Sequence, residues 1–166
     1  QSELMHIYSK FFSEYGYLVG QILLTQVIVN DDYARNNVIN TFETLLELGV
    51  VPIVNENDSV SVEEIMVGKQ DVFSENDTLS AIVAGLTNAD LLIILSDING
   101  FYDGDPKTCR DSKLIPYIEE ITPDIISCAG GAGSNAARGG MVAKIEAARI
   151  AIDAGVDFVQ GFYFRR

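Results

Sequence analysis

The sequence has no tryptophan, one histidine, two cysteines and four prolines among its 166 residues. Two cysteines, Cys109 and Cys128, are too few for a disulfide framework, so we expect a reduced, cytoplasmic protein. No apolar run approaches the ~20 residues that span a bilayer. The first residues do not read as a signal peptide either. We therefore expect neither a disulfide-rich secreted protein nor a membrane protein.

Basic residues are also scarce. The chain has 11 Lys and Arg against 24 Asp and Glu, so its net charge is 11 − 24 = −13. A field of this sign repels nucleic acids and anionic lipids, and we expect neither as a partner. A phosphate group can still bind locally, where backbone amides and one or two lysines outweigh the distant charges.

What is present is a pattern of alternating helices and strands. Because 48% of the residues are hydrophobic and 21% are charged, the composition favours one folded domain. Apolar spacing predicts helices at 4–12, 36–48, from about 76, 123–128 and 141–154, and strands at 17–24, 50–54, 90–96 and 156–159. The uninterrupted apolar run of 90–96 is typical of a parallel strand covered on both faces. This order indicates an α/β fold with a mainly parallel sheet.

Two polar clusters lie where such a fold binds ligands, beyond the carboxyl ends of its strands. Residues 55–58 (NEND) directly follow a predicted strand, and they fit either a small polar ligand or an ordinary Asx-rich turn. Residues 74–77 (SEND) begin a predicted helix and are explained by capping alone. A ligand site is favoured over simple turns and caps only because both clusters are expected at the same edge of the predicted sheet.

A glycine-rich run at 130–140 precedes the long predicted helix that begins at Met141. Gly139 and Gly140 would then open this helix, and free amides with the positive end of its dipole favour a polyphosphate there. Lys144 would lie about one turn into this helix, and it is the only lysine of the chain that follows a glycine-rich loop. The run lacks the Walker A pattern, and a flexible glycine loop is the alternative. Its match to the dinucleotide fingerprint at 131–136 is discounted, because neither a preceding strand nor a helix start within it is predicted.

Five segments together resemble the glutamate 5-kinases, bacterial members of the amino acid kinase superfamily. They are GQILLTQ, VPIVNENDSV, FSENDTLSA, ADLLIILSDINGFYDGDP and RGGMVAKIEAA, in that family's order. The resemblance runs from Gln1 to about Val159 and implies a three-layer αβα sandwich with a mainly parallel sheet. Residues 1–166 would be a partial catalytic domain, without the N-terminal strands and phosphate loops and without the C-terminal PUA domain.

The resemblance implies ATP-dependent phosphorylation of the γ-carboxylate of L-glutamate to γ-glutamyl phosphate, which begins proline biosynthesis. It implies Mg²⁺ carried by the nucleotide, no metal site formed by the protein, feedback inhibition by proline, and a homo-oligomer of the full-length protein. Asp58 and Asn76 would bind glutamate. Asp77 and Lys144 would be the catalytic residues. The implied ATP-binding residues are Ser96, Asp97, Arg138, Gly139, Gly140, Met141, Val142, Ala143 and Lys144.

Some positions depart from that pattern. Ala137 and Arg138 stand where the family usually has glycine and threonine, and residues 160–166 differ from the usual continuation. Since the family's first phosphate-contacting lysine and loop are absent, we expect no turnover by this chain alone. Two alternatives stay open: another amino acid kinase acting on aspartate, acetylglutamate or carbamate, and a non-catalytic fragment that binds a nucleotide or an amino acid.

Overall fold

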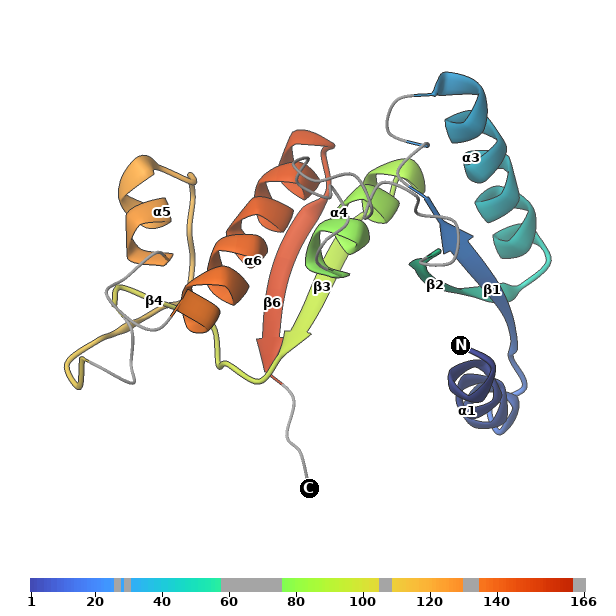
Figure 1. Cartoon of the computed structure of the whole chain (residues 1–166), viewed down its shortest axis with the longest axis horizontal. Helices are drawn as coiled ribbons and strands as arrows, with labels where there is room; N and C mark the ends of the chain where they lie inside the picture. The colour runs from blue at the N-terminus through green and yellow to red at the C-terminus, as the bar shows by residue number, and fades with distance from the viewer. Residues whose placement is uncertain (26–27, 29–30, 58–75, 105–108, 130–134, 163–166) are drawn as a thin grey trace. The chain divides into compact units, whose positions relative to one another are not determined.

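The computed structural model describes residues 1–25, 28, 31–57, 76–104, 109–129 and 135–162. The chain divides into two compact units, Gln1–Asn76 and Asp77–Arg166. The elements are α1 (Ser2–Ser13), β1 (Leu18–Leu24), α3 (Asp32–Glu47), β2 (Val50–Glu56), α4 (Asn76–Leu86), β3 (Leu91–Ser96), β4 (Phe101–Tyr102), β5 (Leu114–Ile115), α5 (Pro123–Ala129), α6 (Asn135–Asp153) and β6 (Asp157–Phe162) (Figure 1). None of the described helices is long and apolar enough to cross a membrane.

In the first unit, β1 and β2 form a parallel pair joined by α3. A Cβ built on Gly20 of β1 would lie 3.2 Å from Val50 Cγ1 and 3.4 Å from Leu45 Cδ2 of α3. The missing side chain at Gly20 therefore lets α3 approach the strand closely. Phe42 of α3 and Leu24 of β1 are each only 2% exposed, and they belong to the core of this unit.

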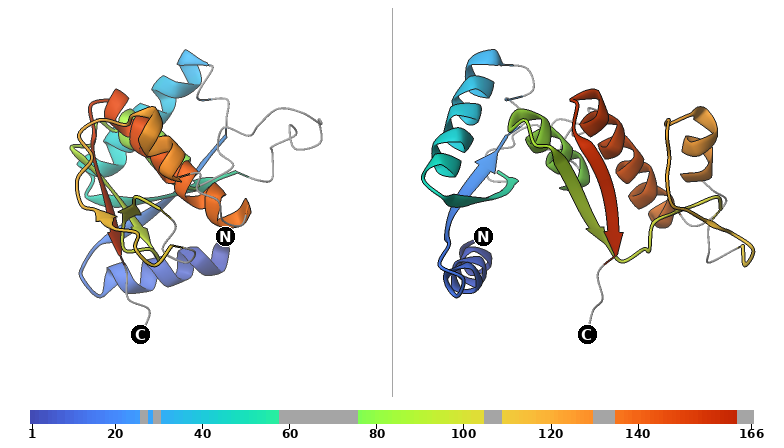
Figure 2. Two further views of the ribbon diagram at one scale, coloured as in Figure 1. Left: turned by 90° about the vertical axis from the view of Figure 1, so that its left-hand side faces the viewer. Right: turned by 180° about the vertical axis from the view of Figure 1, so that it is seen from behind.

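The second unit is built on the parallel pair β3–β6, and α4 and α6 cover one face of it (Figures 1 and 2). Small side chains fill the space between helices and sheet. The core consists of Ala81, Ala84, Ile94, Ala147, Ala151 and Val156. Alanine keeps the helices near the strands, so the polar side chains at the ends of these helices are also held near the sheet.

The opposite face of β3 is open in the described structure. Leu91, Ile93 and Leu95 are 45%, 55% and 64% exposed, whereas Ile94 and Ser96 are buried. The expectation that this strand is covered on both faces is therefore wrong for the described residues, which form two layers here. The α/β class and the parallel pairing are confirmed. A short antiparallel pair, β4–β5, was not predicted as a pair of strands.

Several element boundaries differ from the sequence-based expectations, and strand β6, for example, continues through Phe162 rather than ending at Val159. Helix α3 begins at Asp32 rather than at residue 36, because Asp31 caps it. Strand β2 continues through Glu56, so Asn55 and Glu56 belong to the strand and not to the loop after it. Helix α6 begins at Asn135, six residues before Met141, because Ala136 and Ala137 favour a helix enough to offset the two glycines that follow.

Candidate functional site

An ion pair joins α4 and α6, two helices of the second unit. The Nζ of Lys144 donates a hydrogen bond to Oδ2 of Asp77 over 2.8 Å. The two side chains are 16% and 20% exposed, so water screens the pair only in part. These are the two residues for which the sequence implied catalytic roles, and the fold brings them together from positions 67 residues apart.

Helical spacing explains why both side chains face the same space. Lys144 lies three, four and seven residues before Ala147, Ala148 and Ala151, and therefore on the buried face of α6. Asp77 lies four and seven residues before Ala81 and Ala84, on the buried face of α4. The ion pair therefore lies about one helical turn beyond the buried alanines, next to the core that they form.

This layer lies toward the carboxyl ends of β3 and β6. The amide of Val156, just before β6, donates to the carbonyl of Ala151 over 2.9 Å, so the end of α6 lies beside the start of the strand. Seven residues of helix carry the chain back by about 10 Å, or roughly three strand residues. Lys144 is therefore placed near the end of the sheet where α/β folds bind ligands.

Ser96 and Asp97 follow at the carboxyl end of β3. The buried Ser96 hydroxyl donates to Oδ1 of Asp97 over 3.4 Å and accepts from the amide of Ile98 over 3.3 Å. This arrangement is a Ser turn, which fixes the direction in which the chain leaves the strand. The Asp97 side chain is exposed and available to a ligand.

The glycine pair of α6 is not at the start of a helix, contrary to the sequence-based expectation. Gly139 and Gly140 are the fifth and sixth residues of α6, so their amides lie beyond the first turn, where carbonyls of the same helix satisfy amide groups. Lys144 is the tenth residue of the helix. A free helix N-terminus therefore cannot be the reason that phosphate would bind at Gly139 and Gly140.

Gly140 still leaves an open space beside the helix. Apart from its chain neighbours and the backbone of its own helix, no heavy atom of the described residues lies within 4 Å of the position that its Cβ would occupy. Met141 and Ala143 are half-buried, and Val142 is 41% exposed. Arg138 and Gly139 belong to the described helix backbone. The segment that resembles the ATP-binding motif is thus a helix segment with a small, uncovered spot one turn before Lys144.

The two implied glutamate-binding residues are placed differently. Asn76 is exposed and begins α4, directly before Asp77. Asp58 lies outside the described residues. It follows Asn57, whose amide donates to the carbonyl of Leu24 over 2.8 Å at the carboxyl end of the β1–β2 pair. Asn57, the last described residue before Asp58, therefore lies at the end of that sheet.

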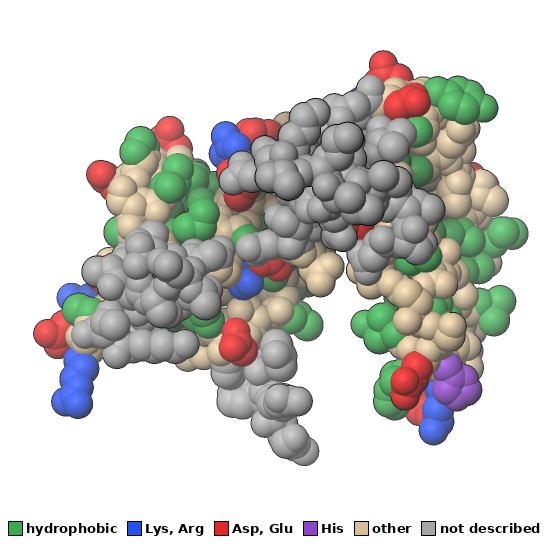
Figure 3. Space-filling model, viewed as in Figure 1, with side chains coloured by type: hydrophobic (Ala, Val, Ile, Leu, Met, Phe, Trp, Pro, Cys, Tyr) green, Lys and Arg blue, Asp and Glu red, His purple; other side chains and the backbone are tan. Residues whose placement is uncertain are grey.

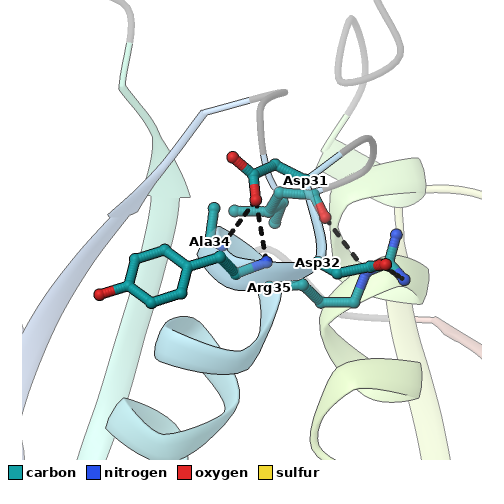
Figure 4. A network of polar contacts seen from close by, with 6 residues as sticks. Asp31, Asp32, Ala34 and Arg35 are labelled. Atoms are coloured by element: carbon teal, nitrogen blue, oxygen red, sulfur yellow. Dashed lines mark hydrogen bonds and ion pairs between the residues drawn. The ribbon is translucent and has the colours of Figure 1, made fainter.

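Sequence reasoning missed a capping network after β1 (Figure 4). The carboxylate of Asp31 accepts from the amides of Tyr33 and Ala34 over 2.8 and 3.1 Å. Arg35 donates through Nε to the carbonyl of Ile28 over 3.2 Å and contacts Asp32 at the same distance. Two aspartates directly before an apolar helical pattern are the signal that could have revealed this start.

The sequence analysis also did not single out Gln160, a polar side chain with an unsatisfied buried nitrogen. It lies on β6 opposite Ile94, and its Nε2 is buried with no hydrogen-bond partner in the described structure. A buried donor without a partner costs about 1–3 kcal/mol. No sequence signal marks a single glutamine in an apolar strand as unsatisfied, because the cost depends on what the fold places around it.

The chain is similar to known proteins over nearly its whole length. The family model described as "Amino acid kinase family" matches residues 1–159. A protein named glutamate 5-kinase from Clostridium perfringens is 56% identical over 161 residues, covering 96% of this chain and 58% of that protein. Proteins of the same name from Listeria innocua and Clostridium tetani are 54% and 53% identical, over 93% and 94% of this chain and 55% and 56% of their own lengths.

The chain spans a little more than half the length of these relatives. The family match nevertheless covers nearly all of it and includes both members of the Asp77–Lys144 pair. The chain belongs to the amino acid kinase family.

Proposed function

We propose that this chain is part of an enzyme that transfers the γ-phosphoryl group of ATP to the γ-carboxylate of L-glutamate. The observation that carries the proposal is the partly buried Asp77–Lys144 pair toward the carboxyl ends of two parallel strands. The names of relatives at 53–56% identity supply the substrate. The product would be γ-glutamyl phosphate, as in the first step of proline biosynthesis.

In the proposed step, a γ-carboxylate oxygen of glutamate attacks the γ-phosphorus of ATP. An oxygen–phosphorus bond forms, the bond to the β,γ-bridging oxygen breaks, and ADP leaves with that electron pair. Negative charge develops on the phosphoryl and bridging oxygens, and a fixed cation stabilises it. Lys144 would supply this cation, and Asp77 would hold its ammonium group in place through the 2.8 Å contact.

The nucleotide would lie along α6 and the end of β3. The open spot at Gly140 gives an ATP phosphate room to approach the helix, and the exposed Asp97 carboxylate is a ready acceptor for hydroxyl or amino groups of the nucleoside. Ser96 would position Asp97, and residues 138–144 would line the phosphate side. The described residues contain no group of three His, Cys, Asp or Glu side chains that fits a metal. As the resemblance implies, Mg²⁺ would bind mainly through the ATP phosphates, which is usual for this ion.

Asp58 and Asn76 would hold glutamate, Asp58 by pairing with its ammonium group and Asn76 by hydrogen bonding beside Asp77. The resemblance further leads us to propose a three-layer sandwich, feedback inhibition by proline, a cytoplasmic location and an oligomer in the full-length protein. Additional chain would cover the open face of β3 in such a sandwich, which agrees with the exposure of Leu91, Ile93 and Leu95.

A chimera tests the proposal. The segments of the Clostridium perfringens relative that this chain does not match are joined to it, and ADP release and acyl phosphate, trapped with hydroxylamine, are measured. We expect both products with L-glutamate, and neither with L-aspartate, N-acetyl-L-glutamate or carbamate. The 166-residue chain and the borrowed segments, assayed separately, should be inactive. ADP release that does not depend on glutamate would contradict the proposal.

A further inference from the structure

Gln160 of β6 has a buried side-chain nitrogen, Nε2, that makes no hydrogen bond within the described residues. The residue as a whole is half-buried, so it lies at the edge of the core and not in its centre. Native proteins satisfy nearly all buried donors, and an exception calls for an explanation such as a bound ion or a catalytic role. The family match ends at residue 159, so membership of the family assigns no role to Gln160.

Gln160 lies on the face of the β3–β6 pair that α4 and α6 cover (Figures 1 and 2). Its partner in the parallel register is Ile94. Paired residues of neighbouring strands project to the same face of a sheet, and successive residues of one strand alternate between faces. Ile94 belongs to the alanine core, and Phe158 packs against that core. Gln160 therefore continues the row of Phe158 toward the carboxyl end of β6.

Along the strand, Gln160 lies at the level of Lys144 or slightly beyond it. Lys144 precedes Ala151 by seven residues, or about 10 Å of helix, and the carbonyl of Ala151 accepts from the amide of Val156. This length corresponds to roughly three strand residues, and Gln160 is four residues after Val156. The amide group is thus on the carboxyl side of the lysine, where α/β folds bind ligands.

Asp77 is placed by an equivalent connection between α4 and β3. The amide of Ala89 donates to the carbonyl of Ala84 over 3.0 Å. Asp77 precedes Ala84 by seven residues, the same interval that places Lys144. The carboxylate therefore lies in nearly the same layer as the lysine, but Nε2 of Gln160 makes no hydrogen bond to it. The ion pair itself does not provide the acceptor that this nitrogen lacks.

An anionic oxygen of a ligand is the acceptor that fits this position. The chain has a net charge of −13, and acidic side chains occur in several places on the face seen in Figure 3. Their field opposes the approach of a polyphosphate, so donors close to the phosphate must offset it. Hydrogen bonds to charged acceptors are the stronger ones, and the neutral amide of glutamine donates without adding repulsion.

We propose that Gln160 is a phosphate-binding residue of this site, and that its Nε2 donates to a phosphoryl oxygen of ATP beside Lys144. This inference rests on the proposed function, which brings the phosphoryl group to the Asp77–Lys144 pair. When ATP is bound, the buried donor gains its partner. When the site is empty, the unsatisfied nitrogen lowers the stability of the fold.

Binding by the chimera gives the first test. Gln160→Met keeps the length of the side chain and removes the amide. Calorimetric titration without glutamate, with ATP and separately with inorganic tripolyphosphate, measures the contact. We expect both affinities to fall about 10-fold or more, as for a lost hydrogen bond to a charged group. Gln21→Met, at an exposed glutamine of β1, is the matched control and should change neither affinity.

The stability of the 166-residue chain without ligand gives a second test, with the opposite sign. Gln160→Met should lower the equilibrium constant of unfolding about fivefold or more, because it removes a buried donor that has no partner. Urea denaturation measures this change, and Gln21→Met should have little effect. A loss of stability in Gln160→Met would show that the amide is already paired in the free protein, and would overturn the proposal.

The outcomes separate this inference from the proposed function. Unchanged ATP affinity in Gln160→Met would overturn the inference, while glutamate-dependent ADP release by the chimera would leave the kinase activity standing. Weaker binding of ATP with unchanged binding of tripolyphosphate would assign Gln160 to the nucleoside, and would also overturn it. A chimera that binds both probes through Gln160 but forms no acyl phosphate would contradict the proposed function alone.

Discussion

Asp77 and Lys144 are separated by 67 positions in the sequence, and their carboxylate and ammonium groups lie 2.8 Å apart. Each comes from the alanine-lined face of its helix, so the pair is positioned by the same packing that forms the core. A pair that is only 16% and 20% exposed holds the lysine in one place, at the cost of removing two charges from water. A partly buried ion pair is weak evidence for stability, and the proposed function would use the fixed lysine in phosphoryl transfer.

The first prediction concerns the charge of Lys144. In the chimera, Lys144→Met should lower kcat by about 10²–10⁴-fold with a smaller change in the KM for ATP, because a charge that acts mainly in the transition state affects kcat most. Steady-state kinetics measure this effect. Lys113→Met, an exposed lysine, is the control and should remain near wild type. Near-normal kcat for a folded Lys144→Met protein would contradict the phosphate role.

The second prediction concerns the coupling of the pair. Asp77→Asn keeps the shape of the side chain but removes the charge that holds Lys144, so kcat of the chimera should also fall by about 10²-fold or more. Asp77→Asn combined with Lys144→Met should then cost much less than the product of the two separate effects, because residues that act as a unit are not additive. Strictly multiplicative losses would indicate that the two groups act independently.

The third prediction separates the two substrates. Asp58→Ala in the chimera should raise the KM for glutamate far more than the KM for ATP, because the proposal assigns this carboxylate to the ammonium group of glutamate. Asp97→Ala, at the proposed nucleotide side, is the reciprocal control and should raise mainly the KM for ATP. Equal effects of Asp58→Ala on both constants would contradict its assignment.

The fourth prediction is that one substitution at Gly140 raises the stability of the chain and weakens its binding of ATP. Alanine at position 140 should stabilise the folded chain by about 0.5–1 kcal/mol, because glycine is unfavourable inside a helix and the open space accommodates a methyl group. The same methyl group should weaken ATP binding by the chimera, since it occupies the space proposed for a phosphate. Thermal unfolding and ATP titration measure the two effects. Unchanged ATP affinity would place the nucleotide elsewhere.

The sequence predicted most of the secondary structure, and particular residues show where it failed. Apolar spacing located every described helix except the first turns of α3 and α6. Those turns begin at Asp32 and Asn135, where polar residues and nearby glycines had indicated a loop rather than a helix. The run LLIIL predicted a strand covered on both faces. No described segment covers the side of Leu91, Ile93 and Leu95, and a pattern within one strand cannot reveal a missing neighbour.

The candidate site was predictable as a set of residues but not as a geometry. The resemblance named Asp77 and Lys144 separately, while their contact depends on how far α4 and α6 extend along β3 and β6. The same limitation applies to Gly140. Its role at a helix start followed from the supposed helix boundary, and the structure replaces that role with an uncovered position inside the helix.

The fifth prediction concerns the start of α3. Asp31→Ala removes an acceptor for the amides of Tyr33 and Ala34, at 2.8 and 3.1 Å, and leaves two N-terminal amides without their partner. Loss of such a cap typically lowers the free energy of unfolding by about 1 kcal/mol. Urea denaturation of the 166-residue chain, followed by circular dichroism, measures the change.

The neighbouring residue provides a matched control, because Asp32 has the same charge and lies one position further along. Its side chain is 89% exposed, and its contact with Arg35 is a surface ion pair at 3.2 Å. Pairs of this kind contribute about 0–1 kcal/mol, and those within one helix about 0.3–0.5. Asp32→Ala should therefore cost less than Asp31→Ala although both substitutions remove one negative charge. If the two variants lose equal stability, the effect comes from charge near the helix terminus rather than from the hydrogen bonds of the cap.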